Sequence, residues 1–210
     1  FEVNENTLIP RPETEELVEW IIESQKSKVK SQKFEILDIG TGTGCIPISL
    51  KANLPHVNVS AIDVSEKALE VARRNAVSNK VEINFIQTNI LEVEDLSQLQ
   101  TPNFQLPTSF DIIVSNPPYV RNLEKEEIKK NVLDYEPHLA LFVEDTDALL
   151  FYRKIAQLAL KNLAPNGLLF FEINQYLGKE TVELLKNLGL KNIELKKDIY
   201  GNDRMVKSTR

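Results

Sequence analysis

The stretch that decides the fold is Phe34-Glu35-Ile36-Leu37-Asp38-Ile39-Gly40-Thr41-Gly42-Thr43-Gly44. Its apolar first half predicts a buried strand, and its glycines predict a sharp turn. The residues from Cys45 to Asn53 then predict a helix. A strand, a glycine-rich turn and a helix in this order indicate a ligand site at a strand tip, because glycine lets the backbone turn sharply and lets a ligand approach closely.

The rest of the chain repeats the alternation of strand and helix, which is typical of an α/β fold with a parallel sheet. Pro12 suits the opening turn of a first helix, and Ser65 is the predicted N-cap of a helix that ends near Asn79. The connection over 116–144 is long, mixed and polar, which favours a functional role. Later helices are predicted over 147–163 and 179–188, and the strands over 34–39, 57–63, 81–87, 110–115, 168–173, 193–199 and 204–209, the last two paired as a hairpin.

Composition excludes several classes of protein. The 210 residues suit one domain, and the net charge of −6 opposes the binding of nucleic-acid phosphates. The single cysteine, Cys45, allows no internal disulfide, and His56 and His138 lie too far apart in the chain to suggest a metal site. No apolar run approaches the roughly 18–20 residues of a membrane helix. We therefore expect a cytoplasmic monomer with no metal, no membrane contact and no nucleic-acid partner.

The glycine turn narrows the kind of ligand. A dinucleotide fingerprint would need glycine where Cys45 or Pro47 stands, and a P-loop would need a Gly-Lys-Ser/Thr sequence that is absent. An acidic strand end followed by Gly-x-Gly-x-Gly instead resembles motif I of the class I methyltransferases. The resemblance implies that S-adenosylmethionine binds here and leaves as S-adenosylhomocysteine, with Asp38 holding the ammonium group of its methionine part. The cofactor residues expected in this turn are Asp38, Gly40, Thr41, Gly42, Thr43 and Gly44.

Two further strand ends carry residues suited to the nucleoside. Asp63 closes the predicted second strand, where a carboxylate can accept hydrogen bonds from both ribose hydroxyls. Asn89 and Ile90 follow the third strand. The class I resemblance implies that Asn89 contacts the adenine amino group and that Ile90 packs on the ring, although many relatives carry aspartate at the position of Asn89.

The tetrapeptide Asn116-Pro117-Pro118-Tyr119 directly follows the fourth predicted strand. It resembles the Asn/Asp-Pro-Pro-Tyr/Phe motif of methyltransferases that act on planar nitrogens. Such a nitrogen is a poor nucleophile because its lone pair is delocalised. The Asn116 side-chain oxygen and the Pro117 carbonyl can each accept one N–H bond, which would orient the NH₂ group and offset its developing charge. The prolines fix φ and leave no competing N–H, and Tyr119 can pack on the planar group.

Five separated motifs resemble the family of peptide chain release factor glutamine methyltransferases. These motifs are Leu8-Ile9-Pro10-Arg11-Pro12-Glu13-Thr14-Glu15, the segment 38–44, the segment 115–119, Tyr135-Glu136-Pro137 and Tyr200-Gly201-Asn202-Asp203-Arg204. The resemblance implies a Rossmann-like class I fold, with a seven-stranded, mostly parallel sheet, helices on both faces and an antiparallel last strand. It also implies that the partner is a class 1 release factor, whose Gly-Gly-Gln glutamine is methylated on its side-chain nitrogen.

The expected catalytic residues are Asn116, Pro117 and Tyr119, and Asn116 is also expected to contact the cofactor. The expected substrate-binding residues add Pro118, Arg11 beside the pocket and Glu172, an acid in an otherwise apolar strand that would be costly to bury unpaired. The family resemblance and the start at Phe1 predict that residues 1–30 lead in from a helical N-terminal domain, and that 31–210 form the methyltransferase domain. The alternatives are an adenine or guanine N-methyltransferase of nucleic acid, which the acidic balance disfavours, and a cofactor-binding scaffold without catalysis.

Overall fold

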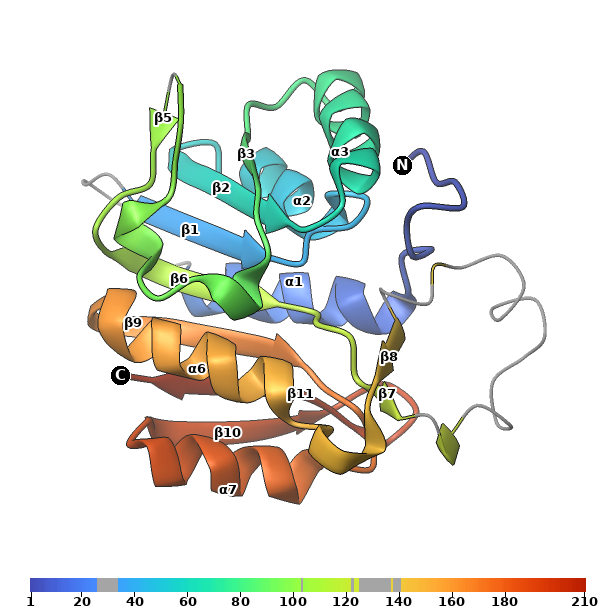
Figure 1. Cartoon of the computed structure of the whole chain (residues 1–210), viewed down its shortest axis with the longest axis vertical. Coiled ribbons are helices and arrows are strands. Elements are labelled where there is room, and N and C mark those ends of the chain that lie inside the picture. Colours follow the sequence, from blue (N-terminus) through green and yellow to red (C-terminus); the bar gives the residue numbers. More distant parts are fainter. Residues whose placement is uncertain (26–33, 103, 122, 125–136, 138–140) are drawn as a thin grey trace.

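The structure is a computed structural model that describes residues 1–25, 34–102, 104–121, 123–124, 137 and 141–210 (Figure 1). Its longer helices are α1 (Pro12–Gln25), α2 (Cys45–Asn53), α3 (Glu66–Ser78), α6 (Leu150–Asn162) and α7 (Gly178–Leu188). The strands of the main sheet are β1 (Phe34–Ile39), β2 (Val57–Asp63), β3 (Asn84–Gln87), β6 (Phe110–Ser115), β9 (Leu163–Glu172), β10 (Lys191–Lys197) and β11 (Asp203–Thr209).

The seven strands of the main sheet lie in the order β10-β11-β9-β6-β1-β2-β3. Neighbours from β9 to β3 run parallel, whereas β11 runs antiparallel to both β9 and β10. The predicted fold class is therefore confirmed, including the antiparallel last strand. The chain order reverses between β1 and β6, and this reversal opens a crevice at the carboxyl ends of the strands, where ligands of such sheets bind.

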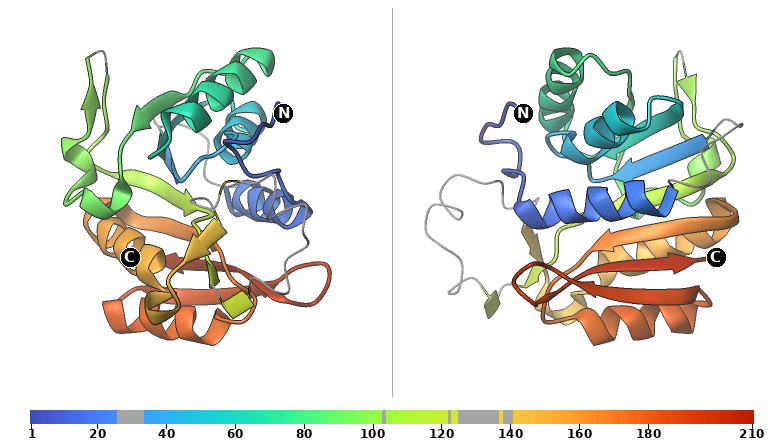
Figure 2. Two further views of the ribbon diagram at one scale, coloured as in Figure 1. Left: turned by 45° about the vertical axis from the view of Figure 1, so that its right-hand side comes forward. Right: turned by 180° about the vertical axis from the view of Figure 1, so that it is seen from behind.

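Side chains of successive strand residues point to opposite faces of the sheet and build two cores. Ile36 of β1 packs with Leu17, Trp20 and Ile21 of α1, whereas Leu37 packs on the opposite face with Ile155 of α6. Helices α1 and α2 thus cover one face, and α6 and α7 cover the other (Figure 2). Trp20 meets Phe170 of β9 edge to face, with ring centroids 5.5 Å apart. Helix α1 is therefore held firmly against the sheet.

Most predicted boundaries agree with the structure, and the exceptions have local causes. Strand β3 begins at Asn84 rather than at 81, because the Val81 N–H binds the Ala76 carbonyl and closes the end of α3. Helix α6 begins at Leu150 because Asp145–Asp147 form a 3₁₀ turn, η4. Strand β9 begins at Leu163 rather than at 168, with an irregular start, and β10 spans 191–197 because a turn begins at 198.

Two short strand pairs lie outside the main sheet. Strands β4 (Gln100–Thr101) and β5 (Phe104–Gln105) form a small hairpin between β3 and β6. Strands β7 (Val120–Arg121) and β8 (Phe142–Val143) pair in parallel at either end of the long connection. Two further 3₁₀ turns, η1 (Ile90–Glu92) and η2 (Leu96–Gln98), follow β3. The predicted domain boundary at residue 30 lies outside the described residues. The same holds for Tyr135, Glu136 and His138.

Candidate active site

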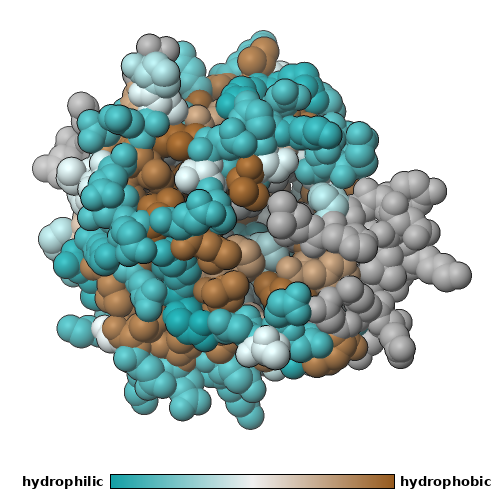
Figure 3. All heavy atoms as spheres, in the orientation of Figure 1, coloured by the Kyte–Doolittle hydropathy of each residue, from teal (hydrophilic) through white to brown (hydrophobic). Residues whose placement is uncertain are grey.

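A cavity of about 540 Å³ lies at the carboxyl ends of the parallel strands. Its size suits a small-molecule ligand. Apolar surface crosses the middle of the face seen in Figure 3. The cavity is lined by every residue expected at the cofactor and substrate sites except Asp38 and Gly44, namely Arg11, Gly40, Thr41, Gly42, Thr43, Asp63, Asn89, Ile90, Asn116, Pro117, Pro118, Tyr119 and Glu172.

The glycine turn is fixed by the end of β2. The N–H groups of Gly40 and Thr41 both donate to the Ile62 carbonyl, at 2.8 and 3.0 Å. Asp63 Oδ2 accepts the Gly42 N–H at 2.9 Å, and its Oδ1 accepts the Ser65 N–H at 2.9 Å. Burial raises the pKa of Asp63, and these backbone hydrogen bonds partly offset the rise. Each oxygen keeps a lone pair for a further donor, so Asp63 can shape the turn and still receive a hydroxyl.

Gly44 supports the turn from behind rather than lining the cavity. Its φ is +78°, and a Cβ there would lie 3.0 Å from Ile48 Cδ1 and 3.1 Å from Ala72 Cβ. A side chain at this position would therefore meet both a strained backbone and the packing between α2 and α3. The glycine at position 44 is required by conformation and by close helix packing together.

We expect Gly44→Ala to lower the free energy of unfolding by about 2–4 kcal/mol, the sum of left-handed strain and overpacking. The matched control is Gly189→Ala, because Gly189 has a φ of +99° but a Cβ there would meet nothing within 4 Å. The control should lose only about 1–2 kcal/mol from strain. Urea unfolding of both variants measures the difference, and equal losses would show that the packing around Gly44 tolerates a methyl group.

Asp38 lies in β1 behind the glycine turn and is fully buried. Neither of its carboxylate oxygens makes a hydrogen bond within the described residues, and the hydroxyl of Thr41 is likewise unpartnered there. Burial raises the pKa of Asp38 to about 7, although the nearby Thr41 hydroxyl lowers it somewhat. A buried carboxylate without a partner is costly, so this position is suited to a group that brings a positive charge or several N–H donors.

Asn89 has a structural task in addition to its expected place in the cavity. Its Oδ1 accepts the Leu91 N–H at 3.1 Å and caps the turn η1, and its Nδ2 donates to Glu92 Oε1 at 2.8 Å. Ile90, the next residue, is buried and packs in the core. The capped turn therefore holds both residues at the rim of the cavity, and the carbonyl of Asn89 keeps one lone pair for another donor.

A chain of hydrogen bonds connects the tetrapeptide to the buried acid of β9. Asn116 Nδ2 donates to Thr14 Oγ1 at 3.5 Å, and the Thr14 hydroxyl donates to Glu172 Oε2 at 2.6 Å. The Tyr119 hydroxyl donates to Glu172 Oε1 at 3.1 Å. Because the Thr14 hydroxyl proton is directed at Glu172, its oxygen is left to accept from Asn116. This sequence of donors and acceptors orients the Asn116 amide nitrogen toward Thr14, and it leaves Asn116 Oδ1 available as an acceptor.

Glu172 is 1% exposed, yet it is well supplied with donors. Burial raises its pKa, while the hydroxyls of Thr14 and Tyr119 and the charge of Arg204 lower it and partly offset that rise. Burial also raises the pKa of Tyr119 well above its usual range, so Tyr119 remains a hydroxyl donor at physiological pH. Glu172 lines the cavity, and its expected role in substrate binding stays a prediction.

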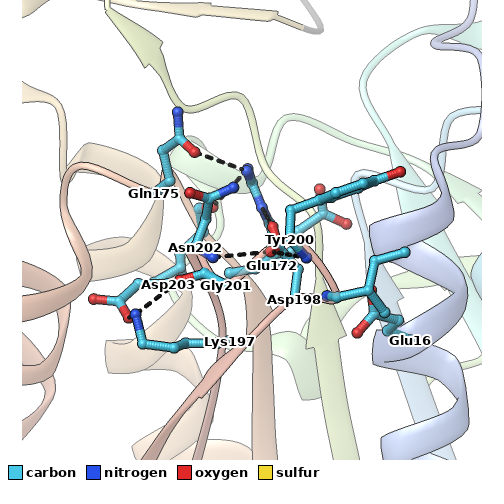
Figure 4. Close-up of polar contacts among 12 residues, drawn as sticks. Glu16, Glu172, Gln175, Lys197, Asp198, Tyr200, Gly201, Asn202 and Asp203 are labelled. Atoms are coloured by element: carbon cyan, nitrogen blue, oxygen red, sulfur yellow. Dashed lines mark hydrogen bonds and ion pairs between the residues drawn. The ribbon is translucent and has the colours of Figure 1, made fainter.

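Figure 4 shows the hairpin turn between β10 and β11, with Asp198, Tyr200 and Asn202 close together. Arg204 follows this turn, and its charge acts on Glu172. Asp198 Oδ1 accepts the N–H groups of Tyr200 and Asn202, both at 2.9 Å, and its Oδ2 pairs with Arg204 Nε at 3.2 Å. Arg204 also donates to the Ile173 carbonyl after β9. The Tyr200–Arg204 motif therefore forms a structured turn that brings a positive charge near the buried acid.

Two polar residues of the site were not assigned a role from the sequence. Thr14 lies on the buried face of α1 with Leu17, Val18 and Ile21. Asn174 Nδ2 donates to the Tyr119 carbonyl at 2.9 Å and so fixes the end of the tetrapeptide. The spacing of Thr14 from the apolar residues of its helix was a usable signal, because a hydroxyl on a buried stripe must find a partner. Asn174 gave no comparable signal.

Cys45 lines the cavity, but its thiol is not activated. Burial raises the pKa of Cys45 to about 11, so the thiol stays protonated and unreactive near neutral pH. Among the described residues no cluster of three or more histidine, cysteine or acidic side chains could hold a metal ion. In the same part of the chain no helix is both long and apolar enough to cross a bilayer.

Comparisons with known proteins agree with this architecture. A family profile described as "Methyltransferase small domain" matches residues 21–138. The solved structure of a ribosomal protein L11 methylase from Lactobacillus delbrueckii superposes with a TM-score of 0.63 at 19% identity, covering 97% of this chain and 81% of that one. The catalytic domain of human Mettl16 superposes with a TM-score of 0.70 at 17% identity, covering 100% and 74% of the two chains. Likeness at this identity shows the fold alone.

Fold and site together define a class I methyltransferase domain. The sequence relatives are more specific. A release factor glutamine methyltransferase from Flavobacterium psychrophilum is 67% identical over 99% of this chain and 69% of its own length. One from Bacteroides thetaiotaomicron is 44% identical over 100% of this chain and 70% of its own length. The chain belongs to the family of release factor glutamine methyltransferases.

Proposed function

We propose that Asn116 Oδ1 and the Pro117 carbonyl oxygen clamp the carboxamide of a release-factor glutamine in the plane required for methyl transfer to its nitrogen. The family identifies the chain as an enzyme that methylates a release factor on glutamine. The observation that carries the clamp is the chain of hydrogen bonds from Glu172 through Thr14 to Asn116, which leaves the Asn116 oxygen as an acceptor at the cavity.

The residues around the glycine turn fit S-adenosylmethionine, the methyl donor implied by the family. The unpartnered carboxylate of Asp38 behind Gly40 matches the need of an ammonium group for an acidic partner. Asp63 and Asn89 each retain acceptor capacity at the cavity, which suits ribose hydroxyls and an adenine amino group. When bound, this cofactor supplies a methyl group on a positively charged sulfur.

The side chains around the tetrapeptide supply orientation rather than a nucleophile. An amide nitrogen shares its lone pair with its carbonyl, so two N–H acceptors in one plane would favour the geometry in which that lone pair faces the methyl carbon. Partial positive charge develops on the nitrogen as the N–C bond forms, and oxygen acceptors stabilise that charge until one N–H proton leaves. Tyr119 would pack on the flat carboxamide while its hydroxyl stays on Glu172. Arg11 would border the same pocket.

The proposed activity is tested by incubating a class 1 release factor with this chain and S-adenosylmethionine, followed by mass spectrometry of its peptides. We expect the gain of one methyl group on the Gly-Gly-Gln peptide, located on the glutamine side chain. Parallel reactions contain DNA, RNA and a release factor whose glutamine is replaced by alanine, and none of these should be labelled. Labelling of nucleic acid without labelling of the release factor would contradict the proposal.

The relay behind Asn116 gives a further prediction. We expect Thr14→Val to lower kcat about 10- to 100-fold with little change in the KM for the methyl donor, since one hydrogen bond to a charged group is worth about 1.5–3 kcal/mol. Thr14→Ser retains the hydroxyl and serves as the matched control, with activity near that of the parent. Steady-state kinetics of the two variants decide the matter, and equal losses of kcat would rule out the hydroxyl relay.

A further inference from the structure

Asn75 of α3 joins two parts of the site that are far apart in sequence. The residue is 2% exposed, and both N–H groups of its Nδ2 and its Oδ1 make hydrogen bonds. Nδ2 donates to the Thr43 carbonyl in the glycine turn at 2.9 Å and to the Glu2 carbonyl at 3.0 Å. Oδ1 accepts the Glu2 N–H at 2.6 Å. One buried amide therefore binds the glycine turn and the N-terminal segment at the same time.

The N-terminal strap, defined as residues 2–11, runs from α3 to the start of α1 (Figure 1). Its residues from Asn6 to Arg11 line the same cavity as the glycine turn. Asn75 anchors the beginning of the strap at Glu2, and the N–H of Thr14 anchors its end by binding the Arg11 carbonyl at 3.1 Å. The strap thus forms one wall of the cavity, and the glycine turn forms another.

We propose that Asn75 is a positioning residue that couples the N-terminal strap to the glycine turn, so that binding of the methyl donor orders the wall against which the glutamine substrate is received. The exposed ion pair between Arg74 and Glu2 does not carry this coupling. Its two side chains are 50% and 46% exposed, and pairs of that kind contribute little.

The physical basis is the cost of breaking hydrogen bonds to a buried side-chain amide. Separation of the strap from α3 would leave the Asn75 amide with two unmet hydrogen bonds while the Thr43 carbonyl still holds it. A ligand that fixes the glycine turn also fixes the Thr43 carbonyl, and so restricts the amide in the orientation that receives Glu2. By thermodynamic linkage, whatever orders the strap must in turn favour the ligand at the glycine turn.

The coupling is tested by amide hydrogen exchange measured by NMR, with S-adenosylhomocysteine as the probe. In the parent chain we expect the ligand to slow exchange of the Glu2 N–H and of the Asn75 side-chain amide about tenfold, within the usual range of coupling between sites. Protection of the glycine turn by the ligand with no change at Glu2 would overturn the proposal. This measurement needs no variant and no methyl transfer.

A pair of variants separates Asn75 from its surroundings. In Asn75→Ala, the ligand should still protect the glycine turn from exchange. It should no longer slow the amide hydrogen exchange of the strap, because the connecting amide is gone. Arg74→Ala is the matched control, because it removes the exposed partner of the same Glu2 and should keep the tenfold effect. Persistence of the ligand effect in Asn75→Ala, or its loss in Arg74→Ala, would contradict the assignment.

The consequence for the substrate rests on the proposed function. We expect S-adenosylhomocysteine to tighten release-factor binding at least about fivefold in the parent chain and to have nearly no effect in Asn75→Ala, as measured by calorimetry. Equal tightening in both chains would refute the role in substrate binding. Failure of the release factor to bind in any condition would instead count against the proposed function, while the exchange experiment would still decide the coupling.

Discussion

Replacement of Asn116 by alanine is expected to lower kcat about 10²- to 10³-fold, the usual cost of removing one preorganised hydrogen-bonding group from a charged transition state. Asn116 provides the side-chain half of the proposed clamp, and alanine leaves only the Pro117 carbonyl. The affinity for S-adenosylhomocysteine should fall far less than kcat, because the glycine turn is held by β2 rather than by Asn116. Steady-state kinetics and calorimetry on the same preparation separate the two effects.

Asn116→Asp is the informative companion variant. It retains an oxygen acceptor at the same position but loses the amide that donates to Thr14. We therefore expect its kcat to lie between those of the parent and of Asn116→Ala. Full transfer activity in the alanine variant would contradict the clamp, and an aspartate variant no better than alanine would show that the acceptor alone is insufficient.

Replacement of Asp38 by asparagine is expected to stabilise the ligand-free protein at pH 8 while weakening donor binding. Burial raises the pKa of Asp38 from 3.8 to about 7. A carboxyl group whose pKa is higher in the folded chain favours folding most at low pH, and this contribution is lost as the pH rises through 7. Asparagine remains neutral, so the free energy of unfolding of the variant should exceed that of the parent at pH 8 by about 4 kcal/mol.

The same substitution removes the charge that would receive the ammonium group of the donor. Affinity for S-adenosylhomocysteine should fall about 10- to 100-fold at pH 8, and the affinity of the parent should itself weaken as the pH falls below 7 and Asp38 becomes protonated. Urea unfolding at pH 4 and pH 8 measures the stability of both chains. Calorimetry at the same two pH values measures their affinity for S-adenosylhomocysteine. Equal stability of both chains at pH 8 would show that burial does not raise the pKa of Asp38, and unchanged affinity in the variant would show that Asp38 is not the ammonium partner.

Much of the fold was predictable because the local sequence patterns favoured the same strands and helices that the sheet contains. The run from Phe34 to Ile39 gave β1 with its observed bounds, and Ser65 caps α3 through its bond to the Ala68 N–H at 3.2 Å. The errors lie where a helix end or turn competes with a strand pattern. At Val81 the apolar alternation predicted a strand, but the chain bonds back to α3 first. Such competition depends on contacts that the pattern of a single segment does not contain.

The residues of the site were more predictable than the bonds between them. Strand ends in a parallel sheet meet at one edge, so the glycine turn, Asp63 and the tetrapeptide could be grouped from their positions alone. The role of Thr14 required knowing that α1 lies beside β9, because only that packing brings its hydroxyl to Glu172. The double use of Asn75 likewise joins residues 32 and 73 positions away, which no local spacing reveals.

The most direct test is a crystal structure of the chain with S-adenosylhomocysteine and a peptide that contains Gly-Gly-Gln. The clamp predicts that the glutamine Nε2 lies within hydrogen-bonding distance of both Asn116 Oδ1 and the Pro117 carbonyl oxygen, with its carboxamide flat against Tyr119 and its nitrogen facing the sulfur. A glutamine nitrogen bound through other groups, with both of these oxygens turned away from it, would contradict the account.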